Sequence, residues 1–459
     1  MSESLQILQQ QLSPQASISK STDPLFNTQR WSECNSATPG AIVNVASEDD
    51  ISNTVSVKWA NTNNIPFLAQ SGGHGLYKGL STLGANGILI NLRALNTVKV
   101  DATAGTATIG GGTLTHEAID AAQAAGTHIV TGVCNTVGVV GALVGGGLGY
   151  LLSVYGMGLD NMISCRLVTA TGEVIEVSAE SNEELWWGIR GAGHNFGIVS
   201  QLVVKAHPWI NRGVHWKGML GFAGGESDVE RVVTAIQEMG VGKNMGLSIL
   251  IARLPPMMGP MLVVFPYYVG PEAEAKVAYA KLLELNPMIN RCGEIPYDKV
   301  NKGHDPACLK GRRKPTFGIA VRTLDVEKMK AAWREWEAFT TANPEAMGST
   351  IIVECFDTRK TREIDPMETA YSWREEDFHM LFVPMHTDPG FDTTALSFGR
   401  KLRDSFKTEG KAAVYVNFAH GDEDLGEIYG SEERLAKLRD LKKTWDPEGR
   451  FSFYNPIPV

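Results

Sequence analysis

The stretch TGVCNTVGVVGALVGGGLGYLLSVYGMGLDNM, residues 131–162, decides how the fold is interpreted. Its glycines allow the backbone to turn tightly and to present N–H groups to an anion such as a phosphate. The run GGGLGY does not match the fingerprint GxGxxG of dinucleotide-binding proteins, and GAGHNFG at 191–197 fails in the same way. The stretch therefore indicates a phosphate-binding loop and disfavours a Rossmann fold.

A second glycine run, QSGGHG at 70–75, places His74 where the main chain is expected to bend. A turn needs no imidazole, so this histidine has another role or is simply solvated in a loop. Cys134 raises the same question in the longer stretch, since a free cysteine is most often a small buried hydrophobe.

The composition limits the classes of function. The 459 residues suffice for two domains. The 42 basic and 51 acidic residues give a net charge of −9 without a basic block, which disfavours nucleic acid as a partner. The six cysteines are scattered and are expected to be mostly reduced. The chain shows neither a secretory signal nor a long apolar segment, so we expect a soluble, cytoplasmic protein without membrane contact, as a monomer or homodimer.

The pattern along the chain predicts an α+β protein with two lobes. Residues 1–33 are a polar tether, and 34–208 alternate short strands with helices, one of which is predicted over 47–64 after a cap at Ser47. Residues 209–410 alternate long strands with charged helices, which predicts an antiparallel sheet backed by helices. The last segment, 411–459, is expected to form a strand, a helix and a DPEG turn that ends the helix.

Five motifs in this order resemble the berberine-bridge-enzyme-like oxidases of the vanillyl-alcohol-oxidase and p-cresol-methylhydroxylase superfamily, in particular their fungal and bacterial secondary-metabolite branch. They are SGGH (71–74), GVCNTVGVVG (132–141), GGGLGYLLSVYGMGLDN (145–161), ELWWGIRGAGHNFGIV (184–199) and YVNF to WDPEGRF (415–451). The resemblance covers nearly the whole chain. It implies a PCMH-type FAD-binding domain at 34–208, a substrate domain at 209–410 and a C-terminal segment at 411–459 that returns to the FAD domain.

The resemblance also implies a doubly attached flavin, with His74 bonded to the 8α-methyl group and Cys134 to C6. A neutral imidazole and a thiolate are nucleophiles suited to an electron-poor flavin. The valine three residues after the cysteine implies an oxidase that returns electrons to O2 and releases H2O2. The remaining cofactor contacts are expected at Ser71, Gly72, Gly73, Gly75, Leu76, Val137, Gly138, Gly141, Gly145, Gly146, Asn161, Ile198 and Asn417.

The catalytic base stays open between Tyr415, His386 and Glu354. The resemblance implies a Glu or Gln on a strand of the substrate lobe, and that position falls here near Phe382, so the polar group is missing. His379 and His386 lie an odd number of residues apart and would point to opposite faces of a regular strand, with His386 on the side of Phe382. A salt bridge to Arg374 is the structural alternative for Glu354.

The leading hypothesis is a flavin-dependent oxidase that removes hydride from a small phenolic, alcohol or polyketide-like metabolite, with ring formation as an optional outcome. A pericyclase that uses FAD only as a scaffold remains an alternative because Phe382 is apolar. An NAD-dependent dehydrogenase and a non-catalytic binding protein are disfavoured. We expect no metal site, since Cys292, His304 and Cys308 have only loose zinc-like spacing.

Overall fold

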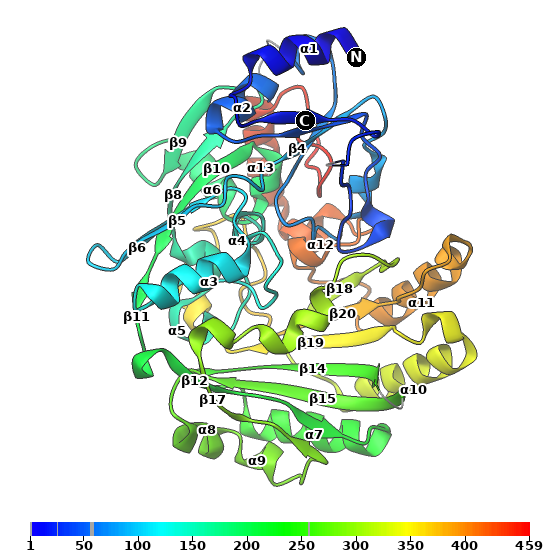
Figure 1. Cartoon of the computed structure of the whole chain (residues 1–459). Coiled ribbons are helices and arrows are strands. Elements are labelled where there is room, and N and C mark those ends of the chain that lie inside the picture. The colour runs from blue at the N-terminus through cyan, green and yellow to red at the C-terminus, as the bar shows by residue number, and fades with distance from the viewer. Residues whose placement is uncertain (1, 25, 56–58, 256–257) are drawn as a thin grey trace.

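The computed structural model describes residues 2–24, 26–55, 59–255 and 258–459, which form two lobes (Figure 1). The first lobe contains two main sheets, and the second is built on one large antiparallel sheet. Helices cover both lobes, so the predicted α+β class with two lobes is confirmed. Among the helices of the described residues, none combines the length and apolar character that crossing a bilayer requires.

The first sheet of the first lobe has the strand order β1-β2-β4-β3, in which β2, β4 and β3 are parallel. The bounds of its elements are β1 (Ser17–Ser19), β2 (Ala41–Asn44), β3 (Phe67–Gln70), β4 (Ile88–Asn91), α1 (Ser2–Gln11) and α2 (Glu48–Val55). As predicted, Ser47 precedes α2, and its hydroxyl accepts the Asp50 N–H at 3.1 Å. The predicted helix over 47–64 ends earlier, at Val55, and residues 56–58 lie outside the described ranges.

The second sheet of the first lobe is antiparallel, with the order β5-β6-β10-β8-β9. Its strands are β5 (Val98–Asp101), β6 (Thr106–Gly110), β8 (Met162–Val168), β9 (Val174–Ser178) and β10 (Ile198–Lys205). The helices beside it are α3 (Thr115–Ala124), α4 (Val139–Leu143), α5 (Leu152–Tyr155) and α6 (Glu183–Ala192). The stretch 131–162 connects α3 to β8 through α4 and α5 and forms the part of the first lobe nearest the large sheet (Figure 1).

The second lobe is a nine-stranded antiparallel sheet in the order β16-β13-β15-β14-β19-β20-β18, with β12 and β17 attached beside β15. The strands are β12 (Val214–Lys217), β13 (Leu220–Phe222), β14 (Met245–Leu254), β15 (Gly259–Tyr268), β16 (Ile289–Asn290), β17 (Gly293–Pro296), β18 (Phe317–Val321), β19 (Thr350–Phe356) and β20 (Phe378–Val383). The helices are α7 (Glu226–Met239), α8 (Glu272–Ala278), α9 (Ala280–Leu283), α10 (Val326–Ala342) and α11 (Asp392–Ser405).

Helix α10 shows why the helices back this sheet. Asp325 caps its N-terminus by accepting the Lys328 N–H at 2.9 Å. Met329, Trp333 and Trp336 recur at helical spacing and are all buried, while the charged residues point outward. Figure 1 shows α7 to α10 on one side of the sheet and the first lobe on the other.

The register of the sheet determines which side chains face the first lobe. Glu354 pairs with His379 on β20 and with Ser248 on β14. Cross-strand partners point to the same side of a sheet. Glu354 and His379 therefore share one face, and their sequence neighbours, such as Met380, face the helices.

The C-terminal segment contains α12 (Leu425–Tyr429) and α13 (Glu432–Trp445) and packs in the first lobe (Figure 1). Lys442 is buried and donates from Nζ to Asp446 Oδ2 at 2.7 Å and to the Asn195 carbonyl at 2.9 Å. This contact holds the end of the chain against the segment that follows α6. The return also carries Tyr415, at the start of a short 3-10 helix (Val416–Phe418), to the boundary between the lobes.

Candidate active site

Two glycine-containing loops meet at the carboxyl end of β3. A Cβ atom added to Gly72 would lie 2.5 Å from the Gly138 nitrogen and 2.6 Å from the Thr136 carbonyl oxygen. A Cβ on Gly138 would overlap the Ser71 side chain. Because only hydrogen fits between the loops, both glycines are required for this contact. The contact brings the two nucleophiles predicted from sequence to one site.

His74 is held as a neutral imidazole. Burial, followed by the charges of Lys310, Lys314 and Arg30, lowers its pKa to about 3. Its Nε2 lies 2.9 Å from Thr136 Oγ1. Cationic neighbours disfavour a charged imidazole and favour negative charge on a group bound nearby.

Cys134 and His74 both contact the hydroxyl of Thr136. The Sγ atom of Cys134 is 3.6 Å from Thr136 Oγ1. The structure pairs it in a disulfide with Cys308, with 6.1 Å between the Cα atoms. The other four cysteines are free, in agreement with the expectation that the cysteines are mostly reduced, and the 3-10 helix Lys302–Cys308 brings the one paired thiol from 174 residues away.

An open pocket of about 490 Å³ of accessible volume lies beside this pair. Thr136, Cys308 and Lys310 line it, together with acidic and basic side chains of the segment 298–305. The region beside His74 and Cys134 is therefore accessible from the surface. Cys292 and His304 do not join Cys308 in a ligand cluster within the described residues, so the loose zinc-like spacing has no structural counterpart.

Several groups near the two loops fit FAD. Ser71 Oγ is buried and has no hydrogen-bond partner among the described residues, as is also true of His194 Nδ1. A Cβ on Gly141 would meet no atom within 4 Å, so space is open above α4. The unpaired Ser71 hydroxyl, a donor beside exposed loop backbone, suits the phosphate oxygens of a dinucleotide.

The other predicted cofactor contacts divide into two groups. Gly145 and Gly146 lie against Asn417 and Tyr415, where Gly146 has φ +151° and its added Cβ would be 2.6 Å from the Tyr415 ring. Leu76 packs against the apolar end of β20. The groups that lie at or beside the loops are Ser71, Gly72, Gly73, Gly75, Leu76, Val137, Gly138, Gly141, Gly145, Gly146 and Asn417.

Two of the residues predicted to bind the cofactor, Asn161 and Ile198, contact only other parts of the protein. The Asn161 amide donates to the carbonyls of Tyr155 and Met157 at 3.0 and 2.8 Å, and its Oδ1 lies 2.7 Å from His207 Nε2. Ile198 is buried in the core cluster beneath the first sheet. The structure therefore gives the Asn161 side chain a structural role, because its hydrogen-bonding groups are already used.

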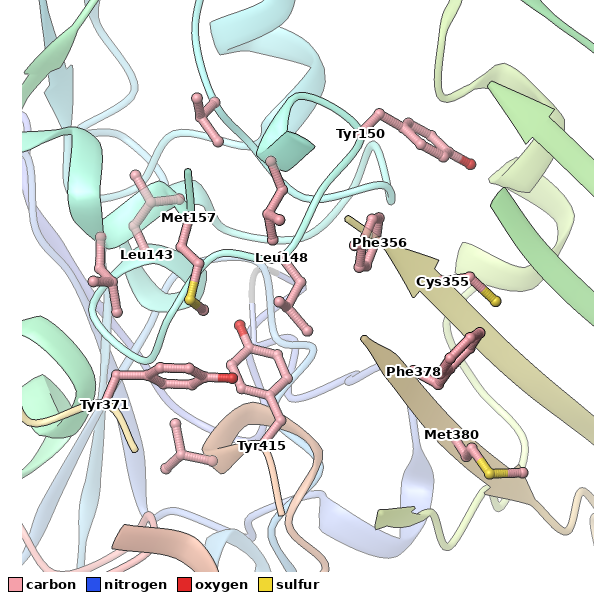
Figure 2. Close-up of a cluster of buried hydrophobic side chains, with 14 of the residues drawn as sticks. Leu143, Leu148, Tyr150, Met157, Cys355, Phe356, Tyr371, Phe378, Met380 and Tyr415 are labelled. Carbon is pink, nitrogen blue, oxygen red and sulfur yellow. The ribbon is translucent and has the colours of Figure 1, made fainter. Parts of the chain in front are cut away.

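Tyr415 lies opposite the stretch 131–162 (Figure 2). Its hydroxyl accepts the Gly147 N–H at 2.9 Å and the Asn417 Nδ2 group at 2.7 Å. Burial nevertheless raises the pKa of Tyr415 to about 12, and Glu354 adds to the effect. A tyrosine that acts as a base needs a lowered pKa, whereas burial holds that of Tyr415 above its usual value. Figure 2 also shows the Tyr371 hydroxyl directed toward the Tyr415 ring.

Glu354 is a buried carboxyl on the sheet face that looks toward Tyr415. Burial raises its pKa to about 8. The proposed salt bridge to Arg374 is wrong, because Arg374 pairs with Asp160 at 2.8 Å and both side chains are almost fully buried. In the described part of the chain, no basic side chain forms an ion pair with Glu354. It also contributes to the raised pKa of Tyr150, so its carboxyl is a neighbour of two tyrosine hydroxyls.

His379, which the sequence analysis did not select, shares this face. Its ring lies 5.9 Å from that of Tyr415 between centroids, and its Nδ1 has no hydrogen-bond partner among the described residues. Burial lowers its pKa to about 4. The expectation that the two histidines point to opposite faces of one strand does not apply, because β20 ends at Val383, before His386. The face was assigned wrongly, because the pairing of β20 with β19 puts residue 379 beside residue 354.

His386 and Phe382 lie away from this site, which corrects the assignment of His386 as a base. Phe382 packs on the helix side of the sheet, 5.6 Å from the Phe406 ring between centroids. His386 follows the end of β20 and bridges to Arg313 through paired backbone hydrogen bonds. Its ring contacts Phe391, and in the described structure it makes no contact with Tyr415. The apolar Phe382 therefore says nothing about the polarity of the substrate pocket.

A further buried polar group borders the same face. Lys217 donates from Nζ to the Tyr150 hydroxyl at 2.9 Å, and the Tyr150 hydroxyl also contacts His304 Nε2. Burial lowers the pKa of Lys217 and of His304 well below their usual values and raises that of Tyr150. Sequence analysis missed this group because its members come from three distant segments.

Comparisons with known proteins identify the family. Residues 39–178 match the family model described as FAD binding domain, and residues 414–458 match the model described as berberine and berberine like. The chain is 32% identical to an FAD-linked oxidoreductase of Neurospora crassa over 446 residues, which cover 94% of this chain and 87% of that protein.

Solved structures share the fold at lower identity. Berberine-bridge-enzyme-like protein 1 of Physcomitrella patens superposes with a TM-score of 0.85 at 20% identity and covers 99% of both chains. Glucooligosaccharide oxidase of Acremonium strictum, a protein described with a 6-S-cysteinyl, 8α-N1-histidyl FAD, gives 0.81 at 18% identity over 96% of both chains. The chain therefore belongs to the berberine-bridge-enzyme-like family of FAD-linked oxidoreductases.

Proposed function

We propose that this oxidoreductase carries FAD bonded to both His74 and Cys134 and oxidises a small phenolic, alcohol or polyketide-like metabolite, with O2 as electron acceptor and H2O2 as product. The observation that carries the proposal is the position of a buried carboxyl, Glu354, beside Tyr415 on the sheet face opposite the two attachment loops. A carboxyl poised near neutral pH suits the removal of a hydroxyl proton.

The attachment chemistry depends on this chain's own groups. His74 is neutral, so a ring nitrogen lone pair is available as a nucleophile. Cys134 can act only as a thiolate, which requires the bond to Cys308 to be open. Ser71 and the loop backbone around Gly72 and Gly138 would bind the diphosphate. The linkage described for the Acremonium oxidase uses the same two residue types.

FAD supplies a two-electron acceptor for the hydride that leaves the substrate carbon. Glu354 accepts the proton of the substrate hydroxyl once its carboxyl is ionised, because its pKa near 8 matches general-base catalysis. Tyr415, fixed by the Gly147 N–H and Asn417, orients that hydroxyl. His379 has an unpaired ring nitrogen on the same face and can accept a hydrogen bond from the substrate.

The rival functions lose their support at this site. The pericyclase alternative rested on Phe382, which packs against the helices. Membership of the FAD-linked family removes the NAD-dependent dehydrogenase and the non-catalytic binding protein. The proposal includes O2 as the electron acceptor, which was inferred from Val137. It also includes the coupling of oxidation to ring formation. The oligomeric state and the cytoplasmic location stay predictions.

The test separates attachment from turnover. Acid precipitation of the purified protein should leave the yellow flavin in the pellet, and peptide mass should place it on His74 and Cys134. The single variants His74→Ala and Cys134→Ala should each keep one bond, and the double variant should release all its flavin. Anaerobic mixing with a panel of phenols and alcohols should bleach the flavin, and air should restore it with formation of peroxide. Complete release of flavin from the unmodified protein would contradict the attachment, and turnover without bleaching would contradict the oxidation.

A further inference from the structure

Three potential metal ligands from separate parts of the chain meet outside the active site. They are Cys34, in the 3-10 helix Glu33–Asn35, His386, beyond the end of β20, and Asp392, the first residue of α11. One ligand atom from each lies within 4.8 Å of the others. His386 has no part in the proposed reaction, and this cluster gives its ring a different set of neighbours.

The tautomer of His386 directs a lone pair into the cluster. Its Nδ1 lies 2.9 Å from the Asp388 carbonyl oxygen. A carbonyl can only accept a hydrogen bond, so the neutral ring carries its proton on Nδ1 and presents an unprotonated Nε2. The side chain is fully buried, and Nε2 has no hydrogen-bond partner among the described residues. An imidazole fixed in this way by a backbone carbonyl is the usual arrangement of a metal ligand.

The spacing of two of the three ligand atoms fits a tetrahedral ion, and the third lies within 4.8 Å of both. His386 Nε2 lies 3.4 Å from Asp392 Oδ1. Two ligands that are each about 2.0–2.1 Å from zinc at a tetrahedral angle lie about 3.3–3.4 Å apart. A lone pair facing a carboxylate oxygen is repulsive unless a cation or a proton lies between them. The rival explanation is therefore a protonated His386 that pairs with Asp392.

Arg313 orients the carboxylate. Its Nε donates to Asp392 Oδ1 at 2.6 Å, and its Nη2 contacts Oδ2. A carboxylate oxygen has two acceptor positions, so Oδ1 can accept this bond and still bind an ion. Carboxylate ligands are commonly held by such second hydrogen bonds. The Cys34 thiolate and the Asp392 carboxylate are negative, and the Arg313 guanidinium is positive, so the empty site has a net charge of −1. A bound divalent cation would change this net charge to only +1.

We propose that Cys34 Sγ, His386 Nε2 and Asp392 Oδ1 bind one Zn²⁺, with water as the fourth ligand. Sulfur, imidazole nitrogen and carboxylate oxygen are the ligands that zinc takes in proteins. Binding deprotonates the Cys34 thiol, and the proton passes to solvent. Cys34 is half-buried and the Asp392 side chain is one-third exposed, so an ion can reach the site.

The site would join the N-terminal segment to the substrate lobe beside the cofactor loop. Glu33, next to Cys34, accepts and donates hydrogen bonds with the Arg312 backbone. Three residues before Cys34, Trp31 donates its backbone N–H to the Gly73 carbonyl at 2.9 Å. Zinc at this position would therefore stabilise the loop that carries His74, although it would take no part in the reaction.

The test uses the full flavin-containing protein, stripped with a chelator and dialysed first against Zn²⁺ and then against metal-free buffer. Elemental analysis should find one zinc per chain, and X-ray absorption at the zinc edge should show one sulfur at about 2.3 Å with lighter ligands at about 2.0–2.1 Å. Cys34→Ser should weaken zinc binding at least tenfold and remove the sulfur signal. Cys292→Ser, which changes another half-buried thiol, should leave both unchanged.

A second measurement on the unmodified protein does not depend on how the variants fold. Zinc should slow alkylation of Cys34 at least tenfold, as read from peptide mass, and should leave the alkylation of Cys292 unchanged. The proposal is overturned if the unmodified protein retains no zinc, if the absorption spectrum lacks a sulfur ligand, or if zinc leaves the alkylation of Cys34 unchanged. The last result would instead support the protonated His386 paired with Asp392.

Discussion

Replacing Glu354 with glutamine should lower activity and raise stability at alkaline pH. Glutamine keeps the shape of the side chain but cannot ionise or accept a proton. Burial raises the pKa of Glu354 from 4.5 to about 8, so its carboxylate form dominates only above that pH. The rate of flavin reduction in the unmodified enzyme should therefore rise as the pH passes through 8. Loss of a positioned base should slow reduction by about 10²- to 10⁴-fold at the plateau.

The same pKa sets the direction of the stability effect. Between the usual carboxyl pKa of 4.5 and about 8, the folded protein holds the proton that the unfolded chain has released. The free energy of unfolding must then fall as the pH rises through this window, with an upper limit of about 5 kcal/mol at about 1.4 kcal/mol for each pKa unit. Glutamine lacks this ionisation, so Glu354→Gln should be the more stable protein above pH 8, with the difference disappearing below the carboxyl pKa of the unfolded chain.

Two assays check these opposite effects. Anaerobic stopped-flow absorbance gives the rate of flavin reduction across the pH range, and urea unfolding on either side of pH 8 gives the change in stability. Glu345→Gln is the control, since this glutamate is exposed just before β19. A Glu354→Gln enzyme that reduces its flavin within about threefold of the unmodified rate would refute the base assignment. A stability difference that is the same at all pH values would refute the raised pKa.

Three other changes test the surrounding structure. Tyr415→Phe should leave a backbone N–H and a side-chain amide without their acceptor and lower the free energy of unfolding by about 1–3 kcal/mol, measured in urea, while slowing flavin reduction. Cys308→Ser should increase the fraction of flavin bonded to Cys134 in protein made under oxidising conditions, measured by peptide mass; an unchanged fraction would show that the disulfide does not compete. Arg374→Met should leave the buried Asp160 carboxylate without its cationic partner and lower the free energy of unfolding by about 3–5 kcal/mol, and a loss below about 1 kcal/mol in urea would contradict a buried ion pair.

Sequence alone predicted the two-lobed α+β fold, because glycine runs, strand patterns and helix caps are local signals. The glycine at 72 shows the limit of such signals. Its role depends on the close approach of the loop at 136–138, and no spacing within QSGGHG reveals that contact. The five ordered motifs supplied the family, which the comparisons then showed.

The site residues were less predictable, because they depend on strand pairing. Alternation along β20 separates His379 from Phe382, but alternation cannot tell which side meets the helices. The pairing with β19 decides this by placing His379 beside Glu354. Cys308 was missed for a similar reason, because a partner 174 residues from Cys134 is defined only by the folded chain.

The buried ionisable groups of this sheet face share one electrostatic property. Glu354 and Lys217 are both buried, yet no ion pair joins them within the described residues. Burial raises the pKa of the carboxyl and lowers that of the amine, so burial favours the neutral form of both groups. The ionised Glu354 that accepts the substrate proton is a charge in a region of low polarity, and the transfer of the proton removes that charge. Unpaired buried ionisable groups are costly to stability, and their presence on this face rather than on the helix side is a physical reason to place the chemistry here.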